Sequence, residues 1–243
     1  MIRKKAASIT DKKNIIRWRS HEPTRLETFS DAVFAFAVTL IIVSLEVPKT
    51  FDELFETMKG FVSFAACFGL LFLIWNSQNI FFRRFGLADS YITFLNGVLL
   101  FMVLIYAYPL KFLFTLVFSA DGTYLDHGQM LPMIKEMQVP TLMYIYDAGY
   151  IIIYMLFYFM YRHAKNKAAH LELTEYELFE TQTQMNVNLL SAMIGLIGII
   201  ATFVLPDKIK GTSGFIYFLI PLVYFIWFTY RSRKSKKIFG VSG

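Results

Sequence analysis

Long apolar runs separated by short polar segments make up most of this chain. Six runs are long enough to cross the roughly 30 Å hydrocarbon core of a bilayer as helices, which takes about 20 residues. They span residues 25–47, 61–82, 91–118, 139–161, 185–205 and 214–230. The pattern therefore predicts an all-α integral membrane bundle of six transmembrane helices.

The segments between the spans give more local predictions. Apolar side chains at helical spacing predict a short amphipathic helix at the membrane interface; they are Phe51, Leu54, Phe55 and Met58. Pro109 predicts a kink or the end of the third span, because proline removes a backbone donor. The segment that follows, SADGTYLDHGQ, is expected to be a loop because of its Gly and Asp content. Residues 162–181 are expected to form a charged helical connector.

Composition supports the membrane assignment. Hydrophobic residues make up 56% of the 243 residues and charged residues only 17%, which is too apolar for a soluble domain of this length. The first 20 residues are polar and basic, so no signal peptide is expected and the first span should be retained. The net charge of +6 comes from basic residues beside the spans, so no nucleic-acid partner is expected. The one cysteine, Cys67, excludes an intrachain disulfide.

The distribution of Lys and Arg predicts the orientation. With six spans, 18 of the 24 basic residues fall on the side of the two termini and six on the opposite side. Because basic residues are enriched on the cytoplasmic side, both termini are expected to be cytoplasmic, in a multi-pass protein of the cell membrane. This divides the chain into a basic tail at 1–24, a transmembrane domain at 25–231 and a second basic tail at 232–243.

Signals of catalysis or cofactor binding are scarce. The four histidines lie outside the spans, and none stands at metal-ligand spacing with a cysteine or a second histidine. The sequence contains no P-loop, no dinucleotide-binding glycine motif and no nucleophile elbow. We therefore expect no enzyme activity, no cofactor and no resident metal ion. A potassium filter of the T-V-G-Y-G type is also missing, so side chains must form any ion constriction.

The first span begins with charge and continues as an apolar helix. Arg25 and Asp31 stand at its start, and charged residues near hydrocarbon either pair or face water. They therefore form a clamp between helices or part of a water-filled path. Further along, one helical stripe carries the apolar side chains Phe36, Leu40, Val43 and Val47, and Thr39 lies at its edge. Such a stripe is a candidate pore lining, although packing is the commoner role of an apolar stripe on a membrane helix.

The same residues carry a resemblance to a known family. The start of the first span has the pattern R-x-x-x-F-S-D, formed by Arg25, Phe29, Ser30 and Asp31. In a first span followed by five more, this pattern resembles the signature of the transmembrane protein 175 family of potassium channels. Trp75 and Asn96 also resemble family positions, and the six-span layout covers nearly the whole chain.

Two positions depart from the family pattern. Relatives commonly place His after the tryptophan of the second span, where this chain has Gln78 and Asn79. The difference puts any histidine-dependent packing or proton sensitivity at that contact in doubt. Phe36 stands where relatives usually have Ile or Leu.

The resemblance implies a potassium-conducting pore on a symmetry axis, lined by the first span. Because the motif occurs once, it implies a homotetramer in the lipid bilayer, with monovalent cations as the permeating species and K⁺ preferred. The hydrophobic constriction would be formed by Phe36, Leu40 and Val43, and Thr39 would offer a hydroxyl to a partly dehydrated ion. The motif residues Arg25, Phe29, Ser30 and Asp31, together with Trp75 and Asn96, would hold the pore helix in register.

Other interpretations remain open from the sequence. A proton-permeable or proton-coupled secondary transporter would use Arg25, Asp31 and Asn96 as its polar site, although no internal repeat of the kind common in transporters is visible. An interaction scaffold without transport is a third interpretation. Thr39 can also bond the carbonyl four residues earlier in its own helix. Asp31 can raise the local cation concentration unless its pairing cancels that effect.

Overall fold

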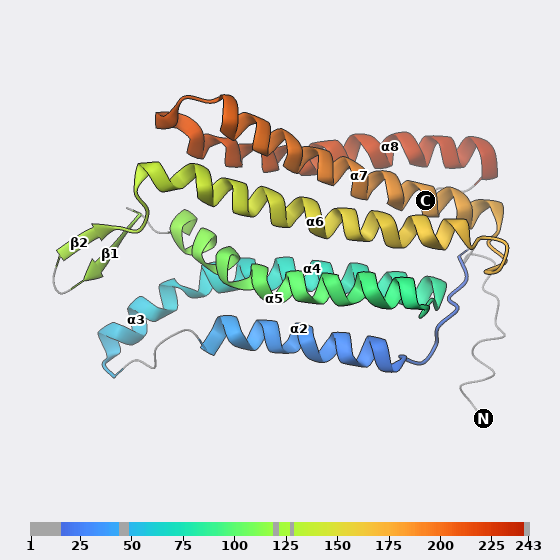
Figure 1. Cartoon of the computed structure of the whole chain (residues 1–243), viewed down its shortest axis with the longest axis horizontal. Coiled ribbons are helices and arrows are strands. Elements are labelled where there is room, and N and C mark those ends of the chain that lie inside the picture. Colours follow the sequence, from blue (N-terminus) through green and yellow to red (C-terminus); the bar gives the residue numbers. More distant parts are fainter. Residues whose placement is uncertain (1–15, 44–48, 119–121, 127–128, 241–243) are drawn as a thin grey trace.

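The computed structural model describes residues 16–43, 49–118, 122–126 and 129–240. Long helices lie side by side in one bundle (Figure 1). They are α2 Arg25–Val43, α3 Phe51–Lys59, α4 Phe61–Phe85, α5 Ser90–Phe118, α6 Val139–Asn166, α7 Glu175–Val204 and α8 Leu219–Phe239. Two 3₁₀ segments, η1 Glu136–Gln138 and η2 Asp207–Phe218, precede α6 and α8, and a hairpin of β1 Thr123–Asp126 and β2 Gln129–Pro132 follows α5.

The predicted all-α membrane bundle is confirmed. Within the described residues, five helical segments are long and apolar enough to cross a bilayer, namely α4, α5, α6 with η1, α7, and α8 with most of η2. The first predicted span corresponds to α2, whose 19 residues carry three acidic or basic side chains near their start. The predicted end of that span, residues 44–47, lies outside the described residues. The short helix expected between the first two spans is present as α3.

Helix α5 continues through Pro109, so the alternative in which this proline ends the span was wrong. A membrane helix tolerates an internal proline where neighbouring groups satisfy the freed backbone atoms. In addition, the hydroxyl of Tyr146 in α6 donates to the carbonyl of Pro109, which ties this turn of α5 to α6. Figure 1 shows the last turns of α5 bending toward the start of α6.

Two connecting segments differ in part from their predictions. The expected loop after α5 contains a strand, because Thr123 pairs with Pro132 and Asp126 with Gln129 in an antiparallel hairpin. Gly and Asp favour a turn, but they do not exclude strands beside it. The expected connector at 162–181 is divided between the end of α6, a turn and the start of α7. The basic residues after 231 continue α8 to Phe239 as helix.

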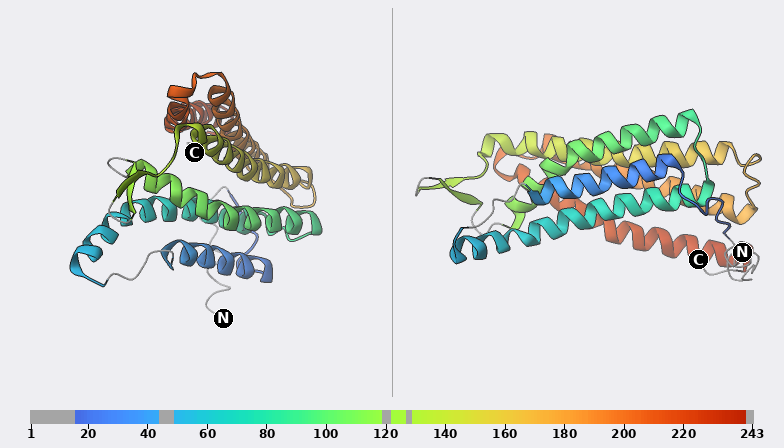
Figure 2. Two further views of the ribbon diagram at one scale, coloured as in Figure 1. Left: turned by 60° about the vertical axis from the view of Figure 1, so that its left-hand side comes forward. Right: turned by 90° about the horizontal axis from the view of Figure 1, so that it is seen from below.

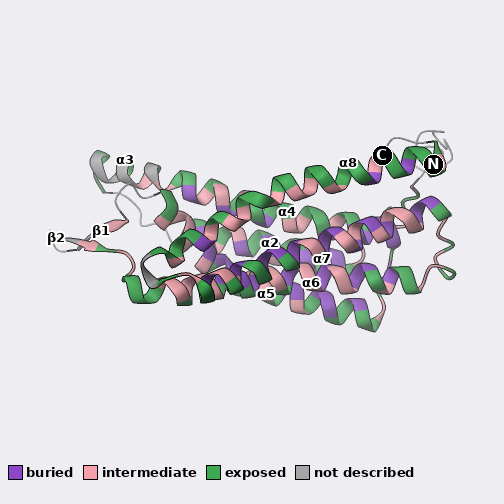
Figure 3. Cartoon of the chain, turned by 90° about the horizontal axis from the view of Figure 1, so that it is seen from above, coloured by how far each residue is buried: buried purple, intermediate pink, exposed green. Residues whose placement is uncertain are grey.

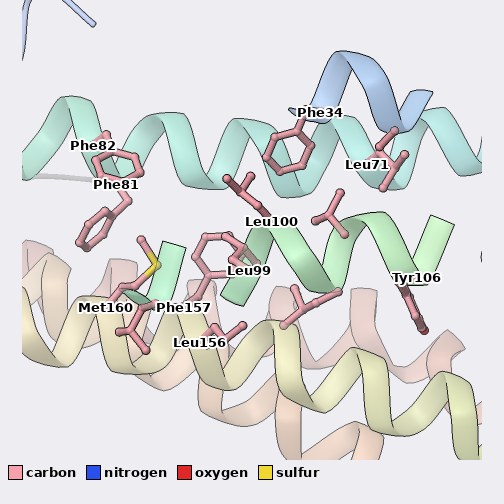
Figure 4. Packing of buried hydrophobic residues seen from close by; sticks show 14 of the residues in the cluster. Phe34, Leu71, Phe81, Phe82, Leu99, Leu100, Tyr106, Leu156, Phe157 and Met160 are labelled. Carbon is pink, nitrogen blue, oxygen red and sulfur yellow. The ribbon is translucent and has the colours of Figure 1, made fainter. Parts of the chain in front are cut away.

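Most long helices pack on helices that are near them in the sequence. Helix α2 packs on α4 and α5, α6 packs on α5 and α7, and α8 packs on α7 and η2. Figures 1 and 2 show α2 and α8 on opposite sides of the bundle. The core lies between these layers and includes Phe34, Leu71, Leu99, Phe157 and Met160 (Figure 4). Figure 3 shows that buried residues concentrate on the facing sides of the helices, while α8 is mostly exposed.

A charged contact fixes the segment that leads into α2. The guanidinium of Arg19 donates two hydrogen bonds of 2.9 Å to the carboxylate of Glu177, which is fully buried at the start of α7. The backbone N–H of Arg19 donates to the carbonyl of Arg83 at 2.9 Å, which ties the same segment to the end of α4. The segment just before α2 is therefore bonded to both α4 and α7.

Candidate functional site

Helix α2 begins at a capping box. The hydroxyl of Thr24 accepts a hydrogen bond from the backbone N–H of Glu27, and the carboxylate of Glu27 accepts one from the backbone N–H of Thr24. These reciprocal bonds satisfy backbone donors that a helix start otherwise leaves unpaired. Glu27 is itself buried, so the cap also fixes how α2 meets the bundle.

One face of α2 is buried against its own subunit. Its members follow the alternating spacing of three and four residues that keeps side chains on one helical stripe; they are Glu27, Ser30, Phe34, Ala37 and Ile41. The last turn of α2 is also bonded to α5, because the ammonium of Lys111 donates to the carbonyl of Ile41 at 3.1 Å. A cation at the C-terminal part of a helix also suits the direction of the helix dipole.

A buried polar chain joins α2 to α5 and α4. The side-chain amide of Asn96 in α5 donates to the hydroxyl of Ser30 at 3.0 Å, and its carbonyl accepts from the amide of Gln78 in α4 at 2.5 Å. The hydroxyl of Ser30 donates in turn to the carbonyl of Leu26 at 2.8 Å. Ser30 and Asn96 have no exposed surface, and Gln78 is 2% exposed. Each such bond between membrane helices contributes roughly 0.6–2 kcal/mol.

A second contact joins α2 to α4 at the edge of this chain. The indole N–H of Trp75 donates to the carboxylate of Asp31 at 2.7 Å. The two residues border a groove between the helices, which is otherwise lined by apolar side chains; they are Phe34, Ala35, Val38, Phe68, Leu71 and Phe72. The carboxylate of Asp31 is therefore already hydrogen-bonded to a neighbouring helix of its own subunit.

The opposite face of α2 is open. Phe29 is 61% exposed and Phe36 is 56% exposed, although both lie on a helix whose other face is fully packed. Thr39 is exposed on the same side and Leu40 is partly exposed. Val43 belongs to α2, but its side chain lies outside the described residues. An apolar helical face that the subunit leaves uncovered must contact lipid, another copy or a pore.

Thr39 is exposed on this open face and is also hydrogen-bonded within its own helix. Its hydroxyl donates to the carbonyl of Ala35 at 2.9 Å, one turn earlier, as the alternative interpretation expected. The bond uses the hydroxyl hydrogen, and the two lone pairs of the oxygen remain to accept or to coordinate. Thr39 therefore presents an oxygen with its hydrogen directed toward its own helix.

The structure brings together four of the six predicted clamp residues. Ser30 contacts Asn96, and Asp31 contacts Trp75. Arg25 and Phe29 do not join them, because both are exposed on other faces of α2. Within the described residues, Arg25 forms no ion pair with Asp31; at 100° per residue the two lie about 120° apart around the helix.

Sequence reasoning assigned no clamp role to Gln78, which completes the buried chain. It lies three residues after Trp75, in the pair Gln78 and Asn79 that stands where His was expected from the resemblance. A polar side chain in the middle of an apolar run needs a partner, but this rule does not say which helix provides it. The same holds for Asp147, whose carboxylate accepts from the hydroxyl of Tyr217 at 2.5 Å across α6 and η2.

The residues of this site lie in the part of the chain that matches a known family. A family model described as the endosomal/lysosomal potassium channel TMEM175 matches residues 25–109, which include every residue of the buried chain and of the Asp31 contact. A potassium channel of Marivirga tractuosa is 35% identical over 232 residues, which cover 91% of this chain and 92% of that protein. This chain belongs to the TMEM175 family of potassium channels. The resemblance noted from its sequence is confirmed.

Solved structures of the TMEM175 family share the fold. A crystal structure of a variant of the potassium channel MtTMEM175, in complex with a nanobody fusion protein, has a TM-score of 0.78. It is 33% identical, and the match covers 90% of this chain and 97% of that one. A lysosomal potassium-selective channel homolog from Chamaesiphon minutus has a TM-score of 0.55 at 19% identity, which shows the same fold.

Proposed function

We propose that this member of the TMEM175 family is a potassium-selective channel through which the ion passes passively along its gradient. Relatives described as potassium channels support the activity. The observation that carries the mechanism is the division of α2 into two faces. Ser30 and Ala37 on one face are fully buried in the subunit, while Phe36 on the other is 56% exposed.

The open face of α2 is suited to a constriction made by side chains. In a ring of copies, Phe36 and Leu40, with Val43 on the same stripe, narrow the path by apolar groups, from which water tends to withdraw. An ion crosses such a ring only after it loses part of its hydration shell. Potassium holds its water less tightly than sodium, so this barrier favours potassium.

Thr39 is the polar group proposed to assist partly dehydrated ions. Its hydroxyl hydrogen is directed to the carbonyl of Ala35, so its oxygen lone pairs are the atoms available to a cation. Asp31 is not part of this path in the proposal. It lies about 140° from Phe36 around the helix and accepts the N–H of Trp75, so its role is to position α2.

A homotetramer is the proposed assembly. One copy supplies a single α2, and a closed ring of four would place four equivalent helices around one axis. The motif R-x-x-x-F-S-D occurs once in the chain, which fits one pore helix per subunit. The proposed location is the cell membrane with both termini cytoplasmic, which the distribution of Lys and Arg supports.

The alternative of a proton-coupled transporter is not favoured. It requires Arg25, Asp31 and Asn96 to form one polar site, but Asn96 is fully buried and already bonded to Ser30 and Gln78. Arg25 is exposed on another face of α2. The family membership also supports a channel. Likewise, no enzyme activity, cofactor or resident metal ion is part of the proposal, and K⁺ enters only as the permeating ion.

Purified protein in liposomes tests the proposal. Electrical recording across a planar bilayer fused with these liposomes should show discrete openings, with a reversal potential that follows the potassium gradient. Saturable exchange without openings would overturn the channel in favour of a transporter. Light scattering of the purified protein should give the mass of four chains, and a monomer or dimer would overturn the four-helix pore.

A further inference from the structure

Helix α8 lies at the side of the bundle farthest from the proposed pore helix. It packs on α7 and η2, and α2 lies on the opposite side (Figures 1 and 2). If α2 lines the axis, as proposed above, α8 faces the surrounding lipid. The inference that follows rests on this part of the proposed function.

The C-terminal half of α8 is fastened to the start of α7 along one face. The guanidinium of Arg231 donates from Nε to the hydroxyl of Thr183 at 2.8 Å and from Nη2 to the carbonyl of Phe179 at 2.7 Å. It also lies 3.6 Å from the centre of the Phe179 ring. Two turns later, Phe239 packs edge-to-face on Tyr176 and Phe179. The end of α8 is therefore a fixed helix along α7.

The outward face of α8 changes character along its length. Its first part is apolar and strongly exposed, as expected of a lipid-facing surface; Leu222, Phe225, Ile226 and Tyr230 are all at least 55% exposed. Its last part is basic and exposed; it consists of Arg233, Lys234, Lys236 and Lys237. At 100° per residue, Ile226, Arg233 and Lys237 fall within about 40° of one another, roughly opposite the buried Ser235.

Because the apolar and basic parts follow one another along the same face of α8, the basic side chains lie at a defined depth in the membrane. A face that contacts acyl chains and then turns basic brings its cations to the level of the phospholipid headgroups. Tyr230 lies at the change from apolar to basic, where aromatic residues of membrane proteins mark the interface. Helix α8 contains no acidic residue that would neutralise these cations. Glu180, the acidic neighbour on α7, interacts with Arg231 on the buried side.

We propose that Arg233 and Lys237, with Lys234 and Lys236 at the two edges, form a binding surface for the headgroups of anionic phospholipids in the adjacent leaflet. The phosphate groups pair with these side chains, and the acyl chains of the same lipids lie along Phe225, Ile226 and Tyr230. Because Arg231 and Phe239 fix the helix, the cations stay on the lipid side. The surface therefore selects lipid by charge at the outer edge of each subunit.

Contact quenching by brominated lipid tests this surface. Trp227, which lies two turns before Lys234 on the same helix, reports on lipid next to α8, and a Trp227→Phe variant recorded in parallel separates its emission from that of Trp18 and Trp75. The full chain is reconstituted in vesicles of equal phosphatidylcholine and phosphatidylglycerol, with bromine on the acyl chains of only one lipid at a time. We expect brominated phosphatidylglycerol to quench the wild type more strongly, with a local preference of about tenfold that falls as the salt concentration rises.

The double variant Arg233→Gln with Lys237→Gln should lose most of this preference. Both positions are exposed, so the fold should be kept, and Arg233→Lys with Lys237→Arg should restore the preference. The matched control is Arg162→Gln with Lys165→Gln, which removes two exposed charges from the end of α6. This control should keep the preference for phosphatidylglycerol. Equal quenching by both brominated lipids in the wild type, or equal loss in test and control variants, would overturn the proposal. Potassium flux from the same vesicles is recorded separately, so failure of the channel proposal is distinguishable.

Discussion

Asn96 of α5 donates a hydrogen bond of 3.0 Å to the hydroxyl of Ser30 in α2, and neither side chain has any exposed surface. The bond lies on the face of α2 that is turned away from Phe36. It therefore fixes the rotation of α2 about its own axis. In the proposed channel, the rotation decides which side chains face the conduction path.

Replacing Asn96 by Leu should destabilise the subunit. The amide of Gln78 would lose its acceptor in a buried site, which costs about 1–3 kcal/mol. Thermal unfolding in detergent measures the change, and Asn96→Leu should unfold several degrees below the wild type. Asn76→Leu is the control, because Asn76 is exposed on α4 and its side chain forms no hydrogen bond within the described residues. An equal drop in unfolding temperature in both variants would contradict the assignment of Asn96 to the buried polar chain.

Asp31→Ala and Trp75→Phe should each weaken assembly more than they change selectivity. Each variant removes one half of the same 2.7 Å hydrogen bond between α2 and α4. Loss of a bond of ~1 kcal/mol would lower the equilibrium constant for correct placement of α2 about fivefold in each subunit, and the tetramer fraction would fall with it. Cross-linking at fixed protein concentration measures this fraction, and the double variant should be no weaker than either single one. A normal tetramer with altered selectivity would show that Asp31 acts on the ion instead.

Phe36→Ala and Leu40→Ala should loosen the selectivity for potassium over sodium. Both substitutions widen the apolar constriction and let a hydrated ion pass with less dehydration. The reversal potential under a potassium and sodium gradient reports the change, which should move toward zero. Phe225→Ala on the lipid side of α8 removes an equally large exposed ring and should leave the potential unchanged. Unchanged potentials in both α2 variants would count against the open face of α2 as pore lining.

Thr39→Val should reduce potassium selectivity, whereas Thr39→Ser should preserve it. Valine keeps the shape and the helix packing but lacks the oxygen that is free to coordinate an ion. Serine keeps that oxygen and the hydrogen bond to the carbonyl of Ala35. Reversal potentials of the two variants test the hydroxyl directly. Equal selectivity in both would leave Thr39 with a role in its own helix alone.

The carboxyl group of Asp89, in the turn between α4 and α5, should make the stability of the protein depend on pH. Partial burial favours protonation of Asp89, but hydrogen bonds from Lys167, the N–H of Ile92 and His163 outweigh it and hold the pKa well below its usual value. A depressed folded-state pKa adds stability above the unfolded pKa of about 4, which is lost as the pH falls toward the folded value. Asp89→Asn should therefore unfold at a lower temperature than the wild type at pH 7. The difference should narrow below pH ~4, and a difference that grows there would contradict this sign.

Much of the fold could be predicted from the sequence, because long apolar runs leave a membrane chain few alternatives. The spans, the amphipathic α3 and the start of α2 at Arg25 all follow from local patterns of apolar and charged residues. The family followed from Arg25, Phe29, Ser30 and Asp31. The element ends were less accurate, because the polar residues from Glu175 onward extend α7 beyond its apolar run, and hydropathy does not register such turns.

By itself the sequence determined that this protein is a helical membrane bundle with a polar motif at the head of its first span. Only the tertiary structure decided which motif residues work together: Ser30 and Asp31 turn toward α5 and α4, and Arg25 and Phe29 turn away. The same packing selected Gln78 as the third member of the buried chain. The physical reason is that hydropathy reports the depth of a residue in the membrane, whereas the face it occupies depends on neighbouring helices that are far away in sequence.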